Sequence, residues 1–269
     1  MLGAIAGDII GSVYEPRGIK SKAFPLFSRG CTFTDDTVLT VAVADAILSR
    51  SDYIDKFHEY FHRYPHAGFG HSFMQWAMQR SRSPYYSFGN GSAMRVSPVG
   101  WAFDDLKTVL AEAEKSAAVT HNHPEGIRGA QAAAACVFLA RTGADKKAIG
   151  EFVVKEFGYN LSQTLADIRK TYRFDVSCQG SVPQSIIAFL ESDGYEDAVR
   201  NAVSLGGDAD TMAAIAGSVA QAFFSMPEEV SRKARTYLDE SLAKVVDQFS
   251  DQFIGPASTI GDQKNTLKS

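Results

Sequence analysis

Apolar and polar positions follow a helical period through most of the chain. Val38, Val41 and Ala42 begin one run with three- and four-residue spacing, which places them on one side of a helix. No window shows the sustained apolar/polar alternation, rich in Val, Ile and Thr, that marks a half-buried strand. We therefore predict an all-α protein with helices over residues 38–48, 53–63, 72–80, 106–119, 125–141, 146–157, 183–190, 196–203, 211–224 and 228–246.

The helices are expected to form one domain. No Pro/Ser-rich linker or internal repeat divides the chain, so we assign a compact all-α domain to residues 1–249 and a polar, partly flexible C-terminal tail to residues 250–269. Pro124, Pro183 and Pro227 stand where a helix can begin, because proline is tolerated in the first helical turn.

Composition and charge exclude several classes of partner. The chain is 45% hydrophobic and 22% charged, as in ordinary globular proteins, and its formal net charge of −4 argues against bulk binding of nucleic acid. No uninterrupted apolar stretch of about 18 residues predicts a membrane-spanning helix.

Three cysteines lie far apart without a CxxC pair, and the apolar N-terminal segment lacks the basic region of a signal peptide. We expect a cytoplasmic protein.

Two acidic clusters of similar chemistry precede long apolar runs. The first is residues 34–37 (Thr-Asp-Asp-Thr), and the second is residues 208–211 (Asp-Ala-Asp-Thr), which follows a Gly-Gly pair. Either cluster alone is equally well explained as a helix cap. A cap needs only one such residue, however, and adjacent carboxylates repel unless a cation or proton neutralises them. If the fold brings the clusters together, they form a four-carboxylate oxygen site that suits Mg2+ or Mn2+.

An acidic pair also stands near the N-terminus. Asp8 and Glu15 are seven residues apart, a spacing that places both on the same face of one helix. A glutamate before a proline is usually just solvated. Beside a metal site, Glu15 could instead act as a general base or position a water molecule.

Two further segments could bind an anion or a sugar. Residues 87–95 (Ser-Phe-Gly-Asn-Gly-Ser-Ala-Met-Arg) lead into a helical run and could cradle a phosphate with backbone N–H groups, with Phe88 stacked on a base, although Gly-Asn-Gly is also a common turn. His121 and His123 suggest a transition metal, but no cysteine is near to complete the site. A hydrogen bond from this segment to a sugar or phosphate is the favoured interpretation.

In this order, the segments resemble the ADP-ribosylglycohydrolase family, which includes ADP-ribosyl-dinitrogen reductase hydrolases and ADP-ribosylhydrolases. The resemblance covers Gly7-Asp8 to Glu15, residues 34–37, 89–95, 120–121 and 206–211. It implies a single-domain orthogonal helical bundle, two Mg2+ or Mn2+ ions, and hydrolysis of the glycosidic bond that joins ADP-ribose to a modified acceptor.

The same resemblance implies a role for each matching residue. The metal ligands would be Thr34, Asp35, Asp36, Asp208, Asp210 and Thr211. The catalytic residues would be Glu15 and the ligand Asp36. The ADP-ribose moiety would be bound by Ser87, Phe88, Gly89, Asn90, Gly91, Ser92, Met94 and His121.

Two other functions stay open. The chain could be a catalytically inactive relative that binds ADP-ribose or serves as a structural protein. The same site could also act on a phosphate ester, because two-metal carboxylate sites support that reaction. The linkage that is cleaved (serine, arginine, a nucleobase or a small molecule) is not indicated by these residues.

Overall fold

The prediction of an all-α protein is confirmed. The computed structural model describes residues 1–255, in which helices and turns are joined by one isolated β-bridge, between Gly89 and Ser177, and no strand is present. In chain order the elements are α1 (Leu2–Gly11), η1 (Glu15–Arg17), α2 (Asp35–Ser49), α3 (Tyr53–Arg63), α4 (His71–Met78), α5 (Gly91–Met94), α6 (Ser97–Ala102), α7 (Leu106–Ala118), α8 (Pro124–Arg141), α9 (Lys146–Phe157), α10 (Leu165–Thr171), α11 (Cys178–Leu190), α12 (Tyr195–Val203), α13 (Ala209–Phe224), α14 (Glu228–Arg235) and α15 (Glu240–Phe253).

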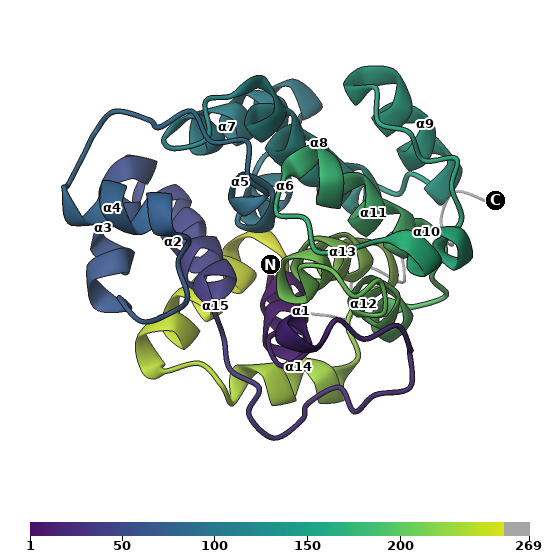
Figure 1. The fold of residues 1–269 in the computed structure, drawn as a ribbon. Coiled ribbons are helices and arrows are strands. Elements are labelled where there is room, and N and C mark those ends of the chain that lie inside the picture. The colour runs from purple at the N-terminus through teal and green to yellow at the C-terminus, as the bar shows by residue number, and fades with distance from the viewer. Residues whose placement is uncertain (256–269) are drawn as a thin grey trace.

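Helix α13 is the central element of the bundle. It contacts α1, α12, α11 and α8, and Figure 1 shows these helices gathered near the middle of the molecule. Every residue from Ala209 to Ala220 is buried. A helix without a polar face is stable only when it is covered on all sides, and the neighbouring helices pack around α13 accordingly.

A ridge of glycines lets α1 approach α13 closely. Gly3, Gly7 and Gly11 recur every four residues and so share one face of α1. A Cβ atom on Gly7 would lie 2.2 Å from the carbonyl oxygen of Ala213, and one on Gly11 would lie 2.4 Å from Cα of Asp210. The glycines therefore let the two helices pack closely, and this contact places the start of α13 against the end of α1.

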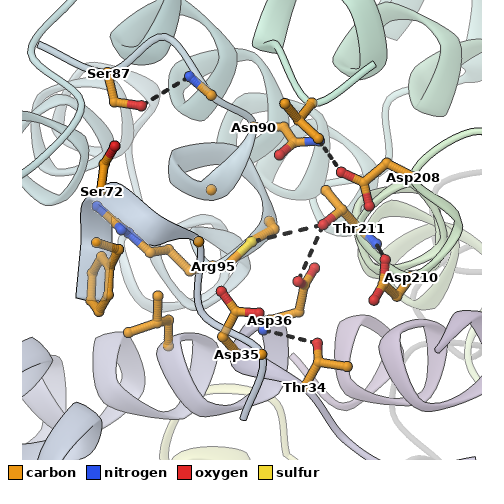
Figure 2. A pocket seen from close by; sticks show the side chains of 18 of the residues that line it. Thr34, Asp35, Asp36, Ser72, Ser87, Asn90, Arg95, Asp208, Asp210 and Thr211 are labelled. Carbon is orange, nitrogen blue, oxygen red and sulfur yellow. Dashed lines mark hydrogen bonds between the residues drawn. The ribbon is translucent and has the colours of Figure 1, made fainter. Parts of the chain in front are cut away.

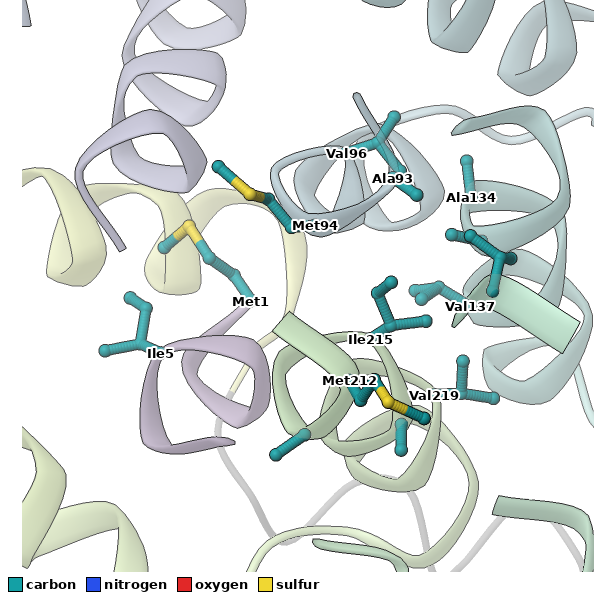
Figure 3. Packing of buried hydrophobic residues seen from close by; sticks show 14 of the residues in the cluster. Met1, Ile5, Ala93, Met94, Val96, Ala134, Val137, Met212, Ile215 and Val219 are labelled. Carbon is teal, nitrogen blue, oxygen red and sulfur yellow. The ribbon is translucent and has the colours of Figure 1, made fainter. Parts of the chain in front are cut away.

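Apolar side chains from several helices fill the space around α13. Figure 3 shows Ile5 of α1, Met94 of α5, Val137 of α8 and Ile215 of α13 in one buried cluster. Burying aliphatic side chains of this size stabilises a fold by about 2 kcal/mol each. The core therefore fixes the positions of α1, α2, α5 and α13, whose ends carry the predicted site residues.

Several helix boundaries differ from the predictions. The single helix expected over 228–246 is wrong: α14 and α15 are separate, because Asp239 caps a new helix by accepting a hydrogen bond from the N–H of Leu242. Helix α11 begins at Cys178 with Ser177 as its cap, so Pro183 lies inside the helix rather than at its start. Helix α15 also runs to Phe253, past the expected domain boundary at residue 249.

The remaining predictions concern short helices and the chain end. Helices α3 and α9 begin and end at the predicted residues, whereas α5, α6 and α10 were too short to give a periodic pattern. Most of the expected tail falls in residues 256–269, outside the described residues. Among residues 1–255, no helix combines the length and apolar character that a membrane crossing requires.

Candidate functional site

The two acidic clusters meet in the fold. They lie at the N-terminal ends of α2 and α13, and the hydroxyl of Thr211 donates a hydrogen bond to Oδ2 of Asp36 over 3.2 Å, across 175 residues of sequence (Figure 2). Thr34 caps α2 by accepting from the N–H of Asp36. Asp208 makes no such side-chain cap on α13. Helix capping therefore accounts for Thr34 and leaves the carboxylates of the second cluster without that explanation.

The carboxylates are close enough to compete for protons or to share a cation. One oxygen from each of Glu15, Asp208 and Asp210 lies within 4.8 Å of the others. Burial, with the charges of Asp210 and Asp8, raises the pKa of Asp35 to about 8. The pKa values of Asp36 and Asp210 are also raised well above their usual range, first by burial and then by neighbouring carboxylates.

One buried carboxylate oxygen has no hydrogen-bond partner within residues 1–255. Oδ1 of Asp36 is inaccessible and accepts no hydrogen bond from the described residues. A buried carboxylate oxygen is normally hydrogen-bonded or bound to a metal. Oxygen ligands from carboxylates and hydroxyls are those that Mg2+ and Mn2+ prefer. The donor set therefore fits hard divalent cations.

Asp8 supports the first cluster from behind. Its carboxylate accepts hydrogen bonds from the backbone N–H and the hydroxyl of Thr34 (2.9 and 2.7 Å), and from both corresponding groups of Thr37. These donors fix the turn that starts α2. Asp8 is fully buried, so it acts on the site through the two threonines.

Asp8 and Glu15 do not share a helix, contrary to the prediction. Helix α1 ends at Gly11, and Glu15 begins the separate short helix η1. Pro16 follows Glu15 directly, and the residue before a proline is disfavoured in a continuing α-helix. The turn still brings the half-buried Glu15 to the second cluster. Burial and the charges of Asp210 and Asp8 raise the pKa of Glu15 to about 7.

A cavity of about 440 Å³ opens on the two clusters (Figure 2). Its lining includes most of the residues that the sequence singled out, together with unpredicted residues such as Tyr85, Ser72 and Arg95. The predicted residues that line it are Glu15, Thr34, Asp35, Asp36, Ser87, Gly89, Asn90, Gly91, Met94, His121, Asp208, Asp210 and Thr211.

The glycine-rich loop is tied into the fold, so the predicted cradle of free N–H groups is only partly present. The N–H of Gly89 donates to Oγ of Ser87 (3.1 Å), and that of Asn90 donates to the carbonyl oxygen of Val176 (2.7 Å). The helix that follows, α5, has only four residues. The side chain of Asn90 donates to Oδ2 of Asp208 over 2.8 Å and links the loop to the second acidic cluster.

Two predicted ligand-binding residues do not line the cavity. The hydroxyl of Ser92 donates to the carbonyl oxygen of Gly126 over 2.7 Å, and its side chain is fully buried. The ring of Phe88 is 49% exposed and packs by its edge against His123, at 5.4 Å between ring centroids. Both side chains are directed by contacts with the start of α8.

The two histidines of the fourth segment have different roles. His123 caps α8, because its Nδ1 accepts a hydrogen bond from the N–H of Glu125 over 3.0 Å. His121 lines the cavity, and its Nδ1 lies 2.7 Å from Oγ1 of Thr120. With His123 engaged as a cap, the pair does not form a two-histidine metal site.

Arg95 ends the glycine-rich segment 87–95 and lines the cavity, although no role was predicted for it. It is fully buried, stacks over the ring of Phe57 at 4.3 Å, and donates from Nη2 to the carbonyl oxygen of Ser116 and to Oγ1 of Thr120. A single arginine after a polar loop resembles a surface residue in sequence. Its burial depends on α3 and α7, which only the fold brings beside it.

Comparison with known proteins identifies related sequences. The profile of a family described as ADP-ribosylglycohydrolase matches residues 1–257. ADP-ribosylhydrolase ARH3 of Mus musculus is 25% identical over 308 residues, covering 85% of this chain and 83% of the mouse protein. ADP-ribosylarginine hydrolase Tri1 of Pseudomonas putida (strain GB-1) is 28% identical over 166 residues, which cover 58% of this chain and 45% of Tri1.

The fold also has a counterpart among solved structures. A chain from an ADP-ribosylglycohydrolase-related protein complex matches with a TM-score of 0.70 and 21% sequence identity, covering 93% of this chain and 96% of that chain. At this identity, the likeness concerns the fold.

Proposed function

The chain belongs to the ADP-ribosylglycohydrolase family, and we propose that it hydrolyses the glycosidic bond between ADP-ribose and a modified amino-acid side chain or related acceptor, using two Mg2+ or Mn2+ ions. The observation that carries this proposal is the convergence of Glu15 with both acidic clusters on one cavity, which also contains the glycine-rich loop and His121.

The chain supplies an oxygen-only ligand set for the cations. Asp35, Asp36, Asp208 and Asp210 would hold two ions, together with the hydroxyls of Thr34 and Thr211. Bound ions would supply Lewis-acid stabilisation and a grip on ribose hydroxyls. Two observations support this assignment: Oδ1 of Asp36 has no hydrogen-bond partner in the part of the chain that the structure describes, and the pKa values of Asp36 and Asp210 are raised.

Glu15 is suited to activate the attacking water. Its carboxylate is half-buried at the cavity and belongs to a short helix separate from both acidic clusters. A general base acts best when its pKa lies near the working pH, and the pKa of about 7 meets this condition in the metal-free protein. Glu15 would orient the water or accept its proton, while Asp36 acts as a ligand beside it.

The other wall of the cavity would hold the nucleotide part of the substrate. Ser87, Gly89, Asn90, Gly91, Met94 and His121 line it and would contact the diphosphate and the adenosine. The side chains of Phe88 and Ser92 do not line this cavity: Ser92 is bound to the carbonyl oxygen of Gly126, and the ring of Phe88 is 49% exposed.

The proposal is tested with purified full-length protein and peptides that carry ADP-ribose on serine or on arginine, in Mg2+, Mn2+ or EDTA. Release of intact ADP-ribose that depends on the cation supports it. The variant Asp208→Ala should lower the rate at least about 100-fold, because even residues that only hydrogen-bond to a metal ligand are worth about 10- to 100-fold in such sites. Full activity in that variant would contradict the proposal.

Other products identify the alternative functions. Release of phosphate or AMP would indicate a phosphoesterase. Calorimetric binding of ADP-ribose without its release from serine, arginine, nucleobase or small-molecule linkages would indicate an inactive binding protein. The relative rates on the two linkages then define the acceptor.

A further inference from the structure

A buried hydrogen-bonded chain leads from Arg95 to the cavity. Nη2 of Arg95 donates to Oγ1 of Thr120 over 2.9 Å, and Oγ1 of Thr120 lies 2.7 Å from Nδ1 of His121. Arg95 and Thr120 are fully buried and His121 nearly so.

The donors and acceptors along this chain constrain the histidine. A guanidinium group can only donate, so Oγ1 of Thr120 must accept from Arg95. The hydroxyl keeps one proton to give, and Nδ1 of His121, at 2.7 Å, is placed to accept it. A histidine that accepts at Nδ1 carries its own proton on Nε2. The hydroxyl of Tyr85, which also lies beside Thr120, is the competing acceptor for that proton.

The ring of His121 is held neutral, so its tautomer decides what it offers to a ligand. Burial and the charge of Arg95 lower the pKa of His121 well below its usual value. A neutral imidazole has one N–H donor and one bare nitrogen acceptor. Oxygens of a diphosphate are acceptors only, and they can be recognised by the Nε2–H form alone.

Nε2 of His121 faces the glycine-rich loop. A Cβ atom on Gly91 would lie 3.2 Å from this nitrogen, and one on Gly89 would lie 3.6 Å from it. Both glycines line the cavity. The absence of side chains at these two positions leaves the nitrogen open to a ligand in the loop.

We propose that Arg95 and Thr120 are positioning residues that hold His121 in its Nε2–H tautomer, so that it donates a hydrogen bond to a diphosphate oxygen of the ADP-ribose moiety. The identity of the ligand rests on the proposed function. The tautomer does not, and it can be measured without substrate.

The first experiment determines the tautomer by NMR of the full chain labelled with 15N-histidine, with the His121 signals assigned from their loss in His121→Gln. The wild type should show the proton on Nε2. Thr120→Val, which removes the hydroxyl at nearly constant volume, should give a mixture of tautomers. Thr120→Ser, which keeps the hydroxyl, should show the same tautomer as the wild type. A proton on Nδ1 in the wild type, or an unchanged tautomer in Thr120→Val, would overturn the proposal.

The second experiment measures ADP-ribose binding by calorimetry. The amide nitrogen of glutamine can take the place of Nε2, whereas that of asparagine is nearer the place of Nδ1. His121→Gln should therefore bind more tightly than His121→Asn, and His121→Asn and Thr120→Val should each weaken binding about tenfold, the value of one well-made hydrogen bond. Equal binding by the two His121 variants, or wild-type binding by Thr120→Val, would contradict the proposed role.

Arg95 is tested by Arg95→Met, which removes the donor to Thr120 and should reproduce the tautomer mixture of Thr120→Val. Circular dichroism checks its fold. If this variant does not fold, the Thr120 pair still decides the proposal. A wild type that binds no ADP-ribose would refute the proposed function while leaving the tautomer measurement intact.

Discussion

Asn90 donates a hydrogen bond from Nδ2 to Oδ2 of Asp208 over 2.8 Å, although 118 residues separate the two in sequence. The same amide nitrogen donates to Oγ of Ser181 over 3.2 Å. The glycine-rich loop and the second acidic cluster are thereby coupled, and the amide orients a carboxylate that we assign as a metal ligand. Partners of this kind fix the geometry of metal ligands.

Replacing Asn90 should weaken metal binding. Asn90→Ala removes the donor that orients Asp208, so the affinity for Mg2+ should fall about tenfold or more. Titration of Mg2+ by calorimetry measures the change. Ser181→Ala is the matched control, because it touches Asn90 without contacting Asp208, and it should have a smaller effect. An unchanged Mg2+ affinity in Asn90→Ala would show that the amide does not support the site.

Glu15→Gln should separate catalysis from metal binding. If Glu15 accepts a proton from the attacking water, kcat should fall by about 100-fold or more, while stabilisation of the protein by Mg2+ is kept. The wild-type rate should also fall as the pH decreases through the pKa of Glu15, because the protonated acid cannot accept a proton. Bound cations should place that pKa below the metal-free value of about 7.

The control for this variant is Glu196→Gln, which changes an exposed ion-paired glutamate on α12 and should leave kcat unchanged. Loss of Mg2+ stabilisation in Glu15→Gln, with the two effects equal in size, would instead identify Glu15 as a metal ligand.

The metal-free protein should lose thermal stability as the pH rises from about 6 to about 8. The folded-state pKa values of Asp35 and Glu15 are about 8 and about 7, above the value of about 4 expected in the unfolded chain. A carboxyl group whose pKa is raised by folding binds more protons in the folded state, so its stabilising contribution is present at low pH and is lost as the pH rises through that pKa.

The measurement is Tm against pH in EDTA, repeated with Mg2+. The cations bind the ionised carboxylates and should remove the downward slope. Asp35→Asn should reduce the slope in EDTA. A metal-free Tm that rises between these pH values would contradict the raised pKa values.

The helices and the two acidic clusters could be predicted where neighbouring residues in the sequence determine them. Both acidic clusters stand directly before long apolar runs, and these runs predicted α2 and α13. The break between α14 and α15 was missed because Val230, Ala234, Leu238, Leu242 and Val246 keep an unbroken four-residue spacing across it. Only the cap at Asp239 marks the second helix, and a single aspartate is a weak signal within an apolar pattern.

The parts of the site that depend on distant segments could not be predicted. Arg95 is buried by Phe57 of α3 and Ser116 of α7, which no sequence pattern places beside it. In the same way, Ser92 turns away from the cavity because its hydroxyl donates a hydrogen bond to the carbonyl oxygen of Gly126. Resemblance to a family assigns residue types to a site, but the direction of a side chain in an irregular loop depends on tertiary contacts.

Gly7→Ala should destabilise the fold strongly. The added methyl group would lie 2.2 Å from the carbonyl oxygen of Ala213, a backbone atom that moves only with α13. We expect a loss of about 3 kcal/mol or more in the free energy of unfolding, at the upper end of overpacking effects. Urea unfolding measures it. Gly194→Ala is the control, because its backbone is extended and a Cβ there meets no atom within 4 Å.

The glycine ridge also imposes an order on biosynthesis. Helix α1 leaves the ribosome long before α13, and N-terminal segments are free to fold first. The surface of α1 that carries Gly3, Gly7 and Gly11 nevertheless packs against α13, so this contact can form only after residues up to Phe224 have been made. Asp210, a proposed metal ligand, lies where α1 contacts the start of α13. We therefore expect the cations to bind only after α13 has packed against α1, late in folding.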